Sequence, residues 1–129
     1  TGTYQETDEL PAKSKACEEA GKPPLKLLKL DTQADITNAV VLGRADAMSA
    51  DSPVTQYAVS QTDGKLVLAG DIFDAAPFGM ATAKDGEMTK ALQAAMQSMM
   101  DDGTYEAILK QWGVEAGAVD TATINGGTS

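Results

Sequence analysis

Short strand patterns alternate with helical patterns along most of this 129-residue chain. Apolar side chains favour four strands, at residues 25–31, 45–50, 65–69 and 78–84. Helical patterns separate the first three of these strands, and connections of that kind join parallel strands. The alternation predicts an α/β fold, a doubly wound lobe in which helices cover both faces of a mostly parallel sheet.

The ends of the predicted helices are marked by specific residue types. An acidic first turn opens a helix over residues 6–20, and Gly21 ends it. Thr32 is a good N-cap for a second helix, whose apolar spacing runs to Gly43. Ser52 as N-cap, followed directly by proline, predicts the start of a third helix.

The C-terminal third of the chain is predicted to be helical up to Gly113. The first of its two helices carries one apolar stripe, made of Met88, Leu92, Met96 and Met99. Thr104 is predicted to cap a last short helix that contains Trp112 and ends at Gly113. Residues 114–129 are rich in Ala, Gly and Thr, and we expect them to form a flexible tail.

Composition excludes several classes of function. The net charge is −9, which argues against nucleic-acid binding because that binding depends on Lys and Arg neutralising phosphates. The chain contains no histidine and one cysteine, Cys17, so a zinc site and an internal disulfide are not expected. No apolar run is long enough to span a bilayer. No metal or organic cofactor is implied.

Asp51 is the most informative candidate for ligand binding. It follows the predicted strand at 45–50, and ligands of open α/β sheets bind beside the carboxyl ends of strands. No histidine or second nucleophile accompanies it, so its carboxylate suits holding a cation such as an amino group better than performing chemistry. The alternative is that Asp51 only caps the helix that follows it.

The loop from Gly2 to Gln5 is a second candidate. It precedes a predicted helix, and successive backbone N–H groups at a helix start can bind an anion. The alternative is that the loop is only a helix cap. Together with Asp51 it outlines a clamp for a zwitterion, with amides for a carboxylate and Asp51 for an ammonium group.

Four segments in order carry a resemblance to a known family. They are residues 2–6, residues 43–47 with Asp51, residues 76–81, and residues 102–105 with 112–113. With these segments the chain resembles the second half of a bacterial extracellular solute-binding protein of the polar amino-acid ABC-transporter family. The resemblance covers residues 1 to about 113, and the fold it implies is a type II periplasmic-binding-protein-like lobe.

The resemblance also implies a function and a set of binding residues. In that family two lobes close on an amino acid, which is then handed to a membrane permease. The aspartate that matches Asp51 grips the α-amino group, and the loop that matches Gly2, Thr3, Tyr4 and Gln5 offers backbone and hydroxyl donors. The chain would then be a non-enzymatic, extracytoplasmic binding protein, either periplasmic or a cell-surface lipoprotein.

By the same resemblance, the chain divides between two lobes. Residues 1–77 correspond to the second, ligand-binding lobe without its first strand, residues 78–113 return to the first lobe, and residues 114–129 follow as the tail. Most of the first lobe is not encoded here. We therefore expect the first-lobe half, or a second copy of the chain, as a partner that completes the fold.

Two other functions are compatible with the same fold. A dehydratase-type enzyme would need an acid–base residue in its cleft, and here only carboxylates, Tyr and Lys could serve. A ligand-sensing ectodomain would continue into a transmembrane helix. The sequence upstream of Thr1 would discriminate between these classes, because a secretory leader and a first lobe would indicate a transport protein.

Overall fold

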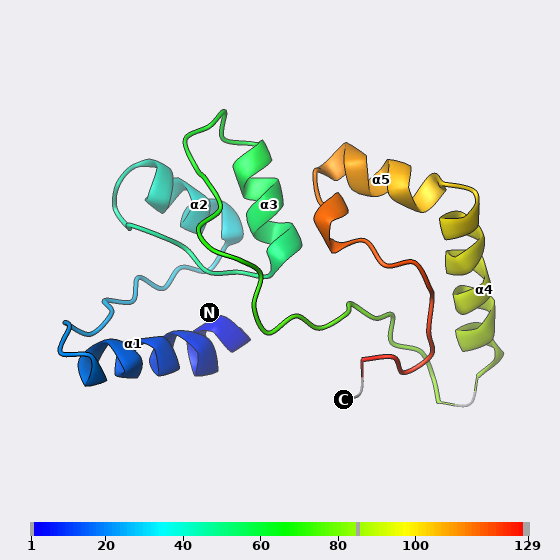
Figure 1. The fold of residues 1–129 in the computed structure, drawn as a ribbon, viewed down its shortest axis with the longest axis horizontal. Coiled ribbons are helices and arrows are strands. Elements are labelled where there is room, and N and C mark those ends of the chain that lie inside the picture. Colours follow the sequence, from blue (N-terminus) through cyan, green and yellow to red (C-terminus); the bar gives the residue numbers. More distant parts are fainter. Residues whose placement is uncertain (1, 85, 128–129) are drawn as a thin grey trace. The chain divides into compact units, whose positions relative to one another are not determined.

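The computed structural model describes residues 2–84 and 86–127 and divides into two compact units, Thr1–Val67 and Leu68–Ser129 (Figure 1). This boundary comes from the internal contacts of each unit. The assignment of residues 1–77, 78–113 and 114–129 to two lobes and a tail stays a prediction.

The first unit contains three helical stretches. A π-helical turn, η1 (Gln5–Glu9), continues directly into α1 (Leu10–Glu19), and α2 (Gln33–Val41) and α3 (Ser52–Ser60) follow. Pro11 has no N–H to donate to the carbonyl one turn earlier, and the widened turn lies next to it. The predicted helix over 6–20 is thus confirmed, with Gly21 at φ 72° beyond its end.

Several predicted helix boundaries are confirmed by hydrogen bonds. The Thr32 side chain accepts the backbone N–H of Asp35 at 3.1 Å, as an N-cap should. Gly43 at φ 69° lies just beyond α2 in the left-handed conformation that favours glycine. Ala39 in α2 and Ala58 in α3 are the buried apolar residues among those described, so the core of this unit is small.

The second unit contains two consecutive helices, α4 (Glu87–Asp101) and α5 (Thr104–Trp112), and a 3-10 turn, η2 (Glu115–Gly117). Gly113 at φ 66° ends α5, as predicted. None of the described residues of this unit is buried. Its described C-terminal segment is nevertheless attached to α4, because Gln93 Nε2 donates to the Ala122 carbonyl at 2.9 Å and Gln97 Oε1 accepts the Ala122 N–H at 3.0 Å.

Two predicted N-caps are wrong by one residue. Asp51, not Ser52, is the N-cap of α3, because its carbonyl accepts the first two helical N–H groups, from Val54 and Thr55. The N-cap of α5 is Gly103, not Thr104. Before that helix the Asp102 carboxylate accepts the Thr104 N–H at 2.8 Å and supplies the acceptor expected from a cap side chain. Hydrogen bonding from the Thr104 side chain, and then from its backbone N–H, lowers the pKa of Asp102.

The four predicted strands are not formed by the residues that the structure describes. Residues 25–30, 47–50, 66–69 and 78–83 lie outside the helices without belonging to a strand. A strand exists only through hydrogen bonds to a neighbouring strand, whereas an α-helix satisfies its own backbone. The doubly wound sheet is therefore absent here, while the helices that would flank it are present.

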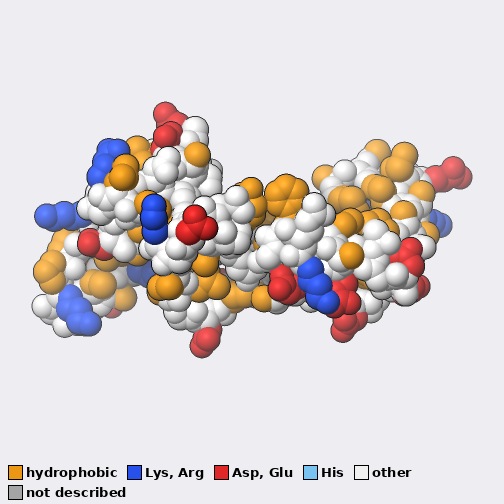
Figure 2. All heavy atoms as spheres, turned by 90° about the horizontal axis from the view of Figure 1, so that it is seen from above, with side chains coloured by type: hydrophobic (Ala, Val, Ile, Leu, Met, Phe, Trp, Pro, Cys, Tyr) orange, Lys and Arg blue, Asp and Glu red, His pale blue; other side chains and the backbone are white. Residues whose placement is uncertain are grey.

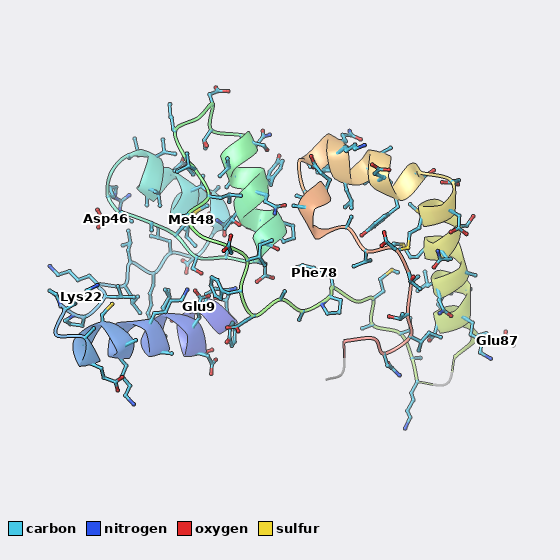
Figure 3. The ribbon with its side chains drawn as sticks, viewed as in Figure 1. Glu9, Lys22, Asp46, Met48, Phe78 and Glu87 are labelled. Atoms are coloured by element: carbon cyan, nitrogen blue, oxygen red, sulfur yellow. The ribbon has the colours of Figure 1, made fainter. Side chains whose placement is uncertain are left out.

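Hydrophobic side chains are visible on the surface of both units (Figure 2). Phe78, which Figure 3 labels, is 74% exposed, and Val67 is 81% exposed. No helix within residues 2–84 and 86–127 is both long and apolar enough to cross a membrane.

Candidate functional site

The Gly2–Gln5 loop leads directly into η1. The Thr3 carbonyl accepts the N–H groups of Glu6 and Thr7 at 3.0 and 3.1 Å, so the helix begins within the predicted loop. Gly2 adopts φ 73°, the left-handed region in which a side chain is disfavoured. The side chains of Thr3 and Tyr4 are exposed at the start of the helix.

One of the loop's amides is already engaged. The Gly2 N–H donates to Glu6 Oε2 at 2.5 Å, and Lys29 Nζ pairs with the other oxygen of the same carboxylate at 2.6 Å. These hydrogen bonds, first the one from Lys29 and then the one from Gly2, lower the pKa of Glu6. An anion at this loop would therefore be held by the amides that follow Gly2, or would displace the Glu6 carboxylate.

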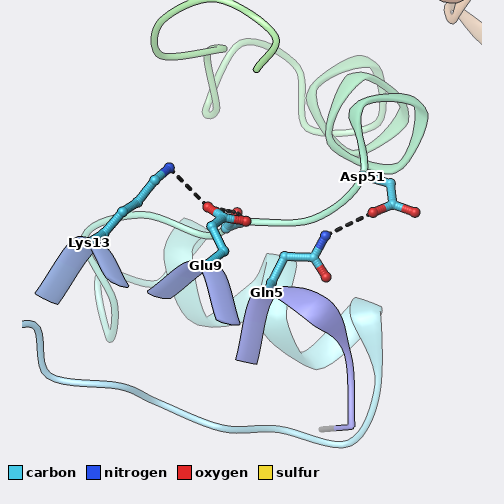
Figure 4. A network of polar contacts seen from close by, with 5 residues as sticks. Gln5, Glu9, Lys13 and Asp51 are labelled. Atoms are coloured by element: carbon cyan, nitrogen blue, oxygen red, sulfur yellow. Dashed lines mark hydrogen bonds and ion pairs between the residues drawn. The ribbon is translucent and has the colours of Figure 1, made fainter. Parts of the chain in front are cut away.

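The Asp51 side chain does not act as a helix cap. Asp51 occupies the N-cap position of α3, but its carboxylate makes no capping hydrogen bond. Instead Asp51 Oδ1 accepts a hydrogen bond from Gln5 Nε2 at 2.8 Å (Figure 4). The structure thus brings together two predicted site residues that are separated by 46 positions.

The other predicted site residues are near this pair in the chain but are not bonded to it. No hydrogen bond joins Thr3 or Tyr4 to Asp51 among the described residues, and Gly2 faces open space. The site that the structure assembles is therefore the Gln5–Asp51 pair at the start of two helices, with the loop beside it. No group of residues within the described chain could hold a metal ion.

Glu9 and Ser49 adjoin this pair, and sequence reasoning missed both. The Glu9 carboxylate is 7% exposed and receives the Ser49 hydroxyl at 2.8 and 3.0 Å from its two oxygens. Lys13 Nζ also pairs with Glu9 Oε1, at 2.9 Å (Figure 4). The spacing of Gln5, Glu9 and Lys13, four residues apart on one helix face, was the available signal.

A groove lies elsewhere in the first unit, between α2 and α3. Its volume is about 490 Å³, and side chains such as Thr37, Asn38, Val54 and Gln61 line it. None of the predicted site residues lines this groove. It is therefore separate from the Gln5–Asp51 pair.

Comparison with known proteins shows relatives of one kind. The chain is 42% identical to the arginine-binding protein ArgT of Corynebacterium glutamicum over 95% of its own length and 40% of that protein. It is 28% identical to the ABC transporter glutamine-binding protein GlnH of Bacillus subtilis, over 70% of the chain and 33% of that protein. The L-cystine-binding protein TcyJ of Escherichia coli is 32% identical over 55% of the chain and 27% of that protein.

These matches confirm the resemblance to amino-acid-binding proteins of ABC transporters. The relatives are binding proteins and not enzymes. The chain spans about 40% or less of the length of these curated relatives, so it corresponds to a part of such a protein. No family model and no solved structure matches the chain.

Proposed function

We propose that this chain is the part of a solute-binding protein that grips the α-amino group of an amino acid. Asp51 would pair with the ammonium group, and the amides of Thr3, Tyr4 and Gln5 would face the carboxylate. The proposal rests on the Gln5–Asp51 hydrogen bond of 2.8 Å, because it puts the carboxylate beside the loop that the clamp requires.

The exposure of the Asp51 side chain supports the same role. Its side chain is exposed and is not used as a cap, so an incoming ammonium group can reach it. Gln5 would keep one oxygen oriented while the other binds the ligand. A carboxylate can form charge-assisted hydrogen bonds with a cation, and these are stronger than hydrogen bonds between neutral groups.

The complete protein would capture its ligand by closing two lobes and would deliver it to an ABC-transporter permease outside the cytoplasm. In that context the segments 25–31, 45–50 and 65–69 would pair as the doubly wound sheet, with a first strand supplied from outside this chain. The first-lobe half, or a second copy of the chain, would also cover the ligand's remaining surface. Good pockets bury about 70–90% of a ligand, and one wall cannot do so.

L-arginine is the first ligand to test. ArgT, whose match covers 95% of this chain, is named for binding arginine. A net charge of −9 also attracts a cationic amino acid over long range. L-glutamine and L-cystine are the comparison ligands, because two other relatives are named for binding them.

The test is calorimetry on the full-length polypeptide that carries this sequence, with Asp51→Asn as the variant. Asparagine keeps the side chain's shape and can still accept from Gln5, but it leaves the ammonium group unpaired. That loss is expected to weaken binding by about 2–5 kcal/mol. Affinity within about threefold of the parent, a change of less than ~1 kcal/mol, would rule out Asp51 as the ammonium partner.

A further inference from the structure

We propose that Glu9 is a positioning residue for Asp51, an inference that rests on the proposed function. Among the described residues, the Glu9 carboxylate is bonded to Ser49 and Lys13 and not to Asp51. The contact of Glu9 with Ser49 fixes the segment that leads into Asp51, two residues further along the chain.

The two contacts pair the helical stretch with the segment before α3 in antiparallel order. Gln5 and Glu9 are four residues apart and bound the π-helical turn η1, whereas Ser49 and Asp51 are two residues apart in a non-helical segment. Gln5 meets Asp51 while Glu9 meets Ser49, so the two segments run in opposite directions.

The Glu9–Ser49 contact is the more buried of the two. The Glu9 side chain is 6% exposed, and both of its oxygens lie within hydrogen-bonding distance of Ser49 Oγ, with Lys13 completing the pairing. Gln5 and Asp51 are more exposed, so water competes for their hydrogen bond. Of the two contacts, the Glu9–Ser49 contact is therefore the more resistant to opening, and it holds the Gln5–Asp51 contact in register.

Removing the carboxylate should release the segment that carries Asp51. In Glu9→Ala the Ser49 hydroxyl loses its acceptor, whereas Glu9→Gln keeps one acceptor oxygen and the side-chain length. Glu9→Gln should therefore retain part of the effect that Glu9→Ala abolishes. Glu19→Gln is the matched control, because Glu19 also pairs with a lysine on α1 but its side chain is exposed.

The first measurement is amide hydrogen exchange in the full-length polypeptide without ligand. In Glu9→Ala we expect exchange at Val54 and Thr55, whose N–H groups donate to the Asp51 carbonyl, to accelerate about tenfold or more, with a smaller acceleration in Glu9→Gln and none in Glu19→Gln. Unchanged exchange in Glu9→Ala would overturn the proposal. This arm needs no ligand, so it decides the role of Glu9 even if the proposed function fails.

The second measurement is a double-mutant cycle with L-arginine as the probe. If Glu9 acts through Asp51, Glu9→Ala should weaken binding about tenfold in the parent but by less than about twofold in the Asp51→Asn background. Equal losses in both backgrounds would show a general structural role and overturn the positioning role. If L-arginine, L-glutamine and L-cystine all fail to bind the parent, the proposed function fails, and the exchange result alone decides whether Glu9 positions Asp51.

Discussion

The two units of this protein use apolar residues in different ways. The first unit, Thr1–Val67, has a small core around Ala39 and Ala58, and side-chain hydrogen bonds connect its distant segments. The second unit, Leu68–Ser129, has the more strongly amphipathic helices, α4 and α5, yet none of its described residues is buried. A strongly amphipathic helix therefore does not form a core by itself, because its apolar face must pack against another surface.

The polar contacts show the same contrast. In the first unit they join elements far apart in sequence, such as Glu9 with Ser49 and Gln5 with Asp51. In the second unit, long-range hydrogen bonds attach the chain's C-terminal segment to α4 and α5, as those of Gln93 and Gln97 do at Ala122. The first unit therefore has contacts that can set the geometry of a site, whereas we expect the second unit to need a surface to pack against.

The largest expected effect concerns that surface. The 129-residue chain alone should self-associate and bind amino acids weakly, because α4 is amphipathic and Met88 of α4, like Ile108 of α5, is exposed. Replacing Met88 and Ile108 by Gln should reduce the associated fraction in light scattering across concentrations. The same change at Leu42 and Val67, exposed residues of the first unit, should have little effect because single exposed apolar residues are ordinary.

A monomeric chain that binds an amino acid by itself would contradict this contrast between the two units. A dissociation constant of about 1 μM for the isolated, monomeric chain would mean that no second wall is needed. The division of the chain between two lobes would then be wrong.

The next effect concerns the loop of the first unit. Gly2→Val should harm ligand binding more than Thr3→Ser, because valine at φ 73° costs about 1–2 kcal/mol while Thr3→Ser keeps the hydroxyl. No atom would clash with the new side chain, so the cost is conformational. Calorimetry on both variants is the measurement, and equally small effects would leave the loop with a structural role only.

A smaller effect is expected at the C-terminal segment of the second unit. Replacing Gln93 and Gln97 by Ala removes both hydrogen bonds to Ala122, worth about 1 kcal/mol each. Proteolysis or exchange within residues 118–124 should become faster while α4 stays protected. Unchanged cleavage would mean that the segment is mobile in the parent, as the sequence predicts for residues 114–129.

The smallest effect is the pH dependence of the Glu6–Lys29 pair. Because its hydrogen bonds lower the pKa of Glu6 in the folded state, the pair stabilises the first unit above the unfolded-state pKa of Glu6. That stabilisation is lost as the pH falls through the lowered folded-state pKa. Lys29→Met should flatten this part of the acid-unfolding curve, and an unchanged curve would show that the pair contributes nothing measurable.

The helices could be predicted from the sequence because their determinants are local. Thr32 caps α2, Gly113 ends α5, and the apolar spacing of α4 is a property of consecutive turns. The exact first residue was less predictable at α3 and α5. There the carbonyls of Asp51 and Gly103 begin the helix one residue before the side chain that the sequence favours.

The candidate site could be predicted only in part. Asp51 and the Gly2–Gln5 loop were identified from their places in the sequence and from the family resemblance, and the structure adds that Gln5 reaches Asp51. Glu9 was missed because nothing local marks it: it is one of 19 acidic residues, and its burial depends on a serine 40 positions away.

The sequence by itself determined the helices, the acidic composition and the residue types of the proposed ammonium-binding site, since each depends on neighbours within a few positions or on composition. Only the tertiary structure decided which carboxylates are buried, which are exposed and which side chains meet. Those outcomes depend on contacts between segments that are far apart in the sequence, such as Glu9 with Ser49. The predicted sheet was neither determined by the sequence nor formed by the described residues, because strands form only when a partner strand satisfies their backbone hydrogen bonds.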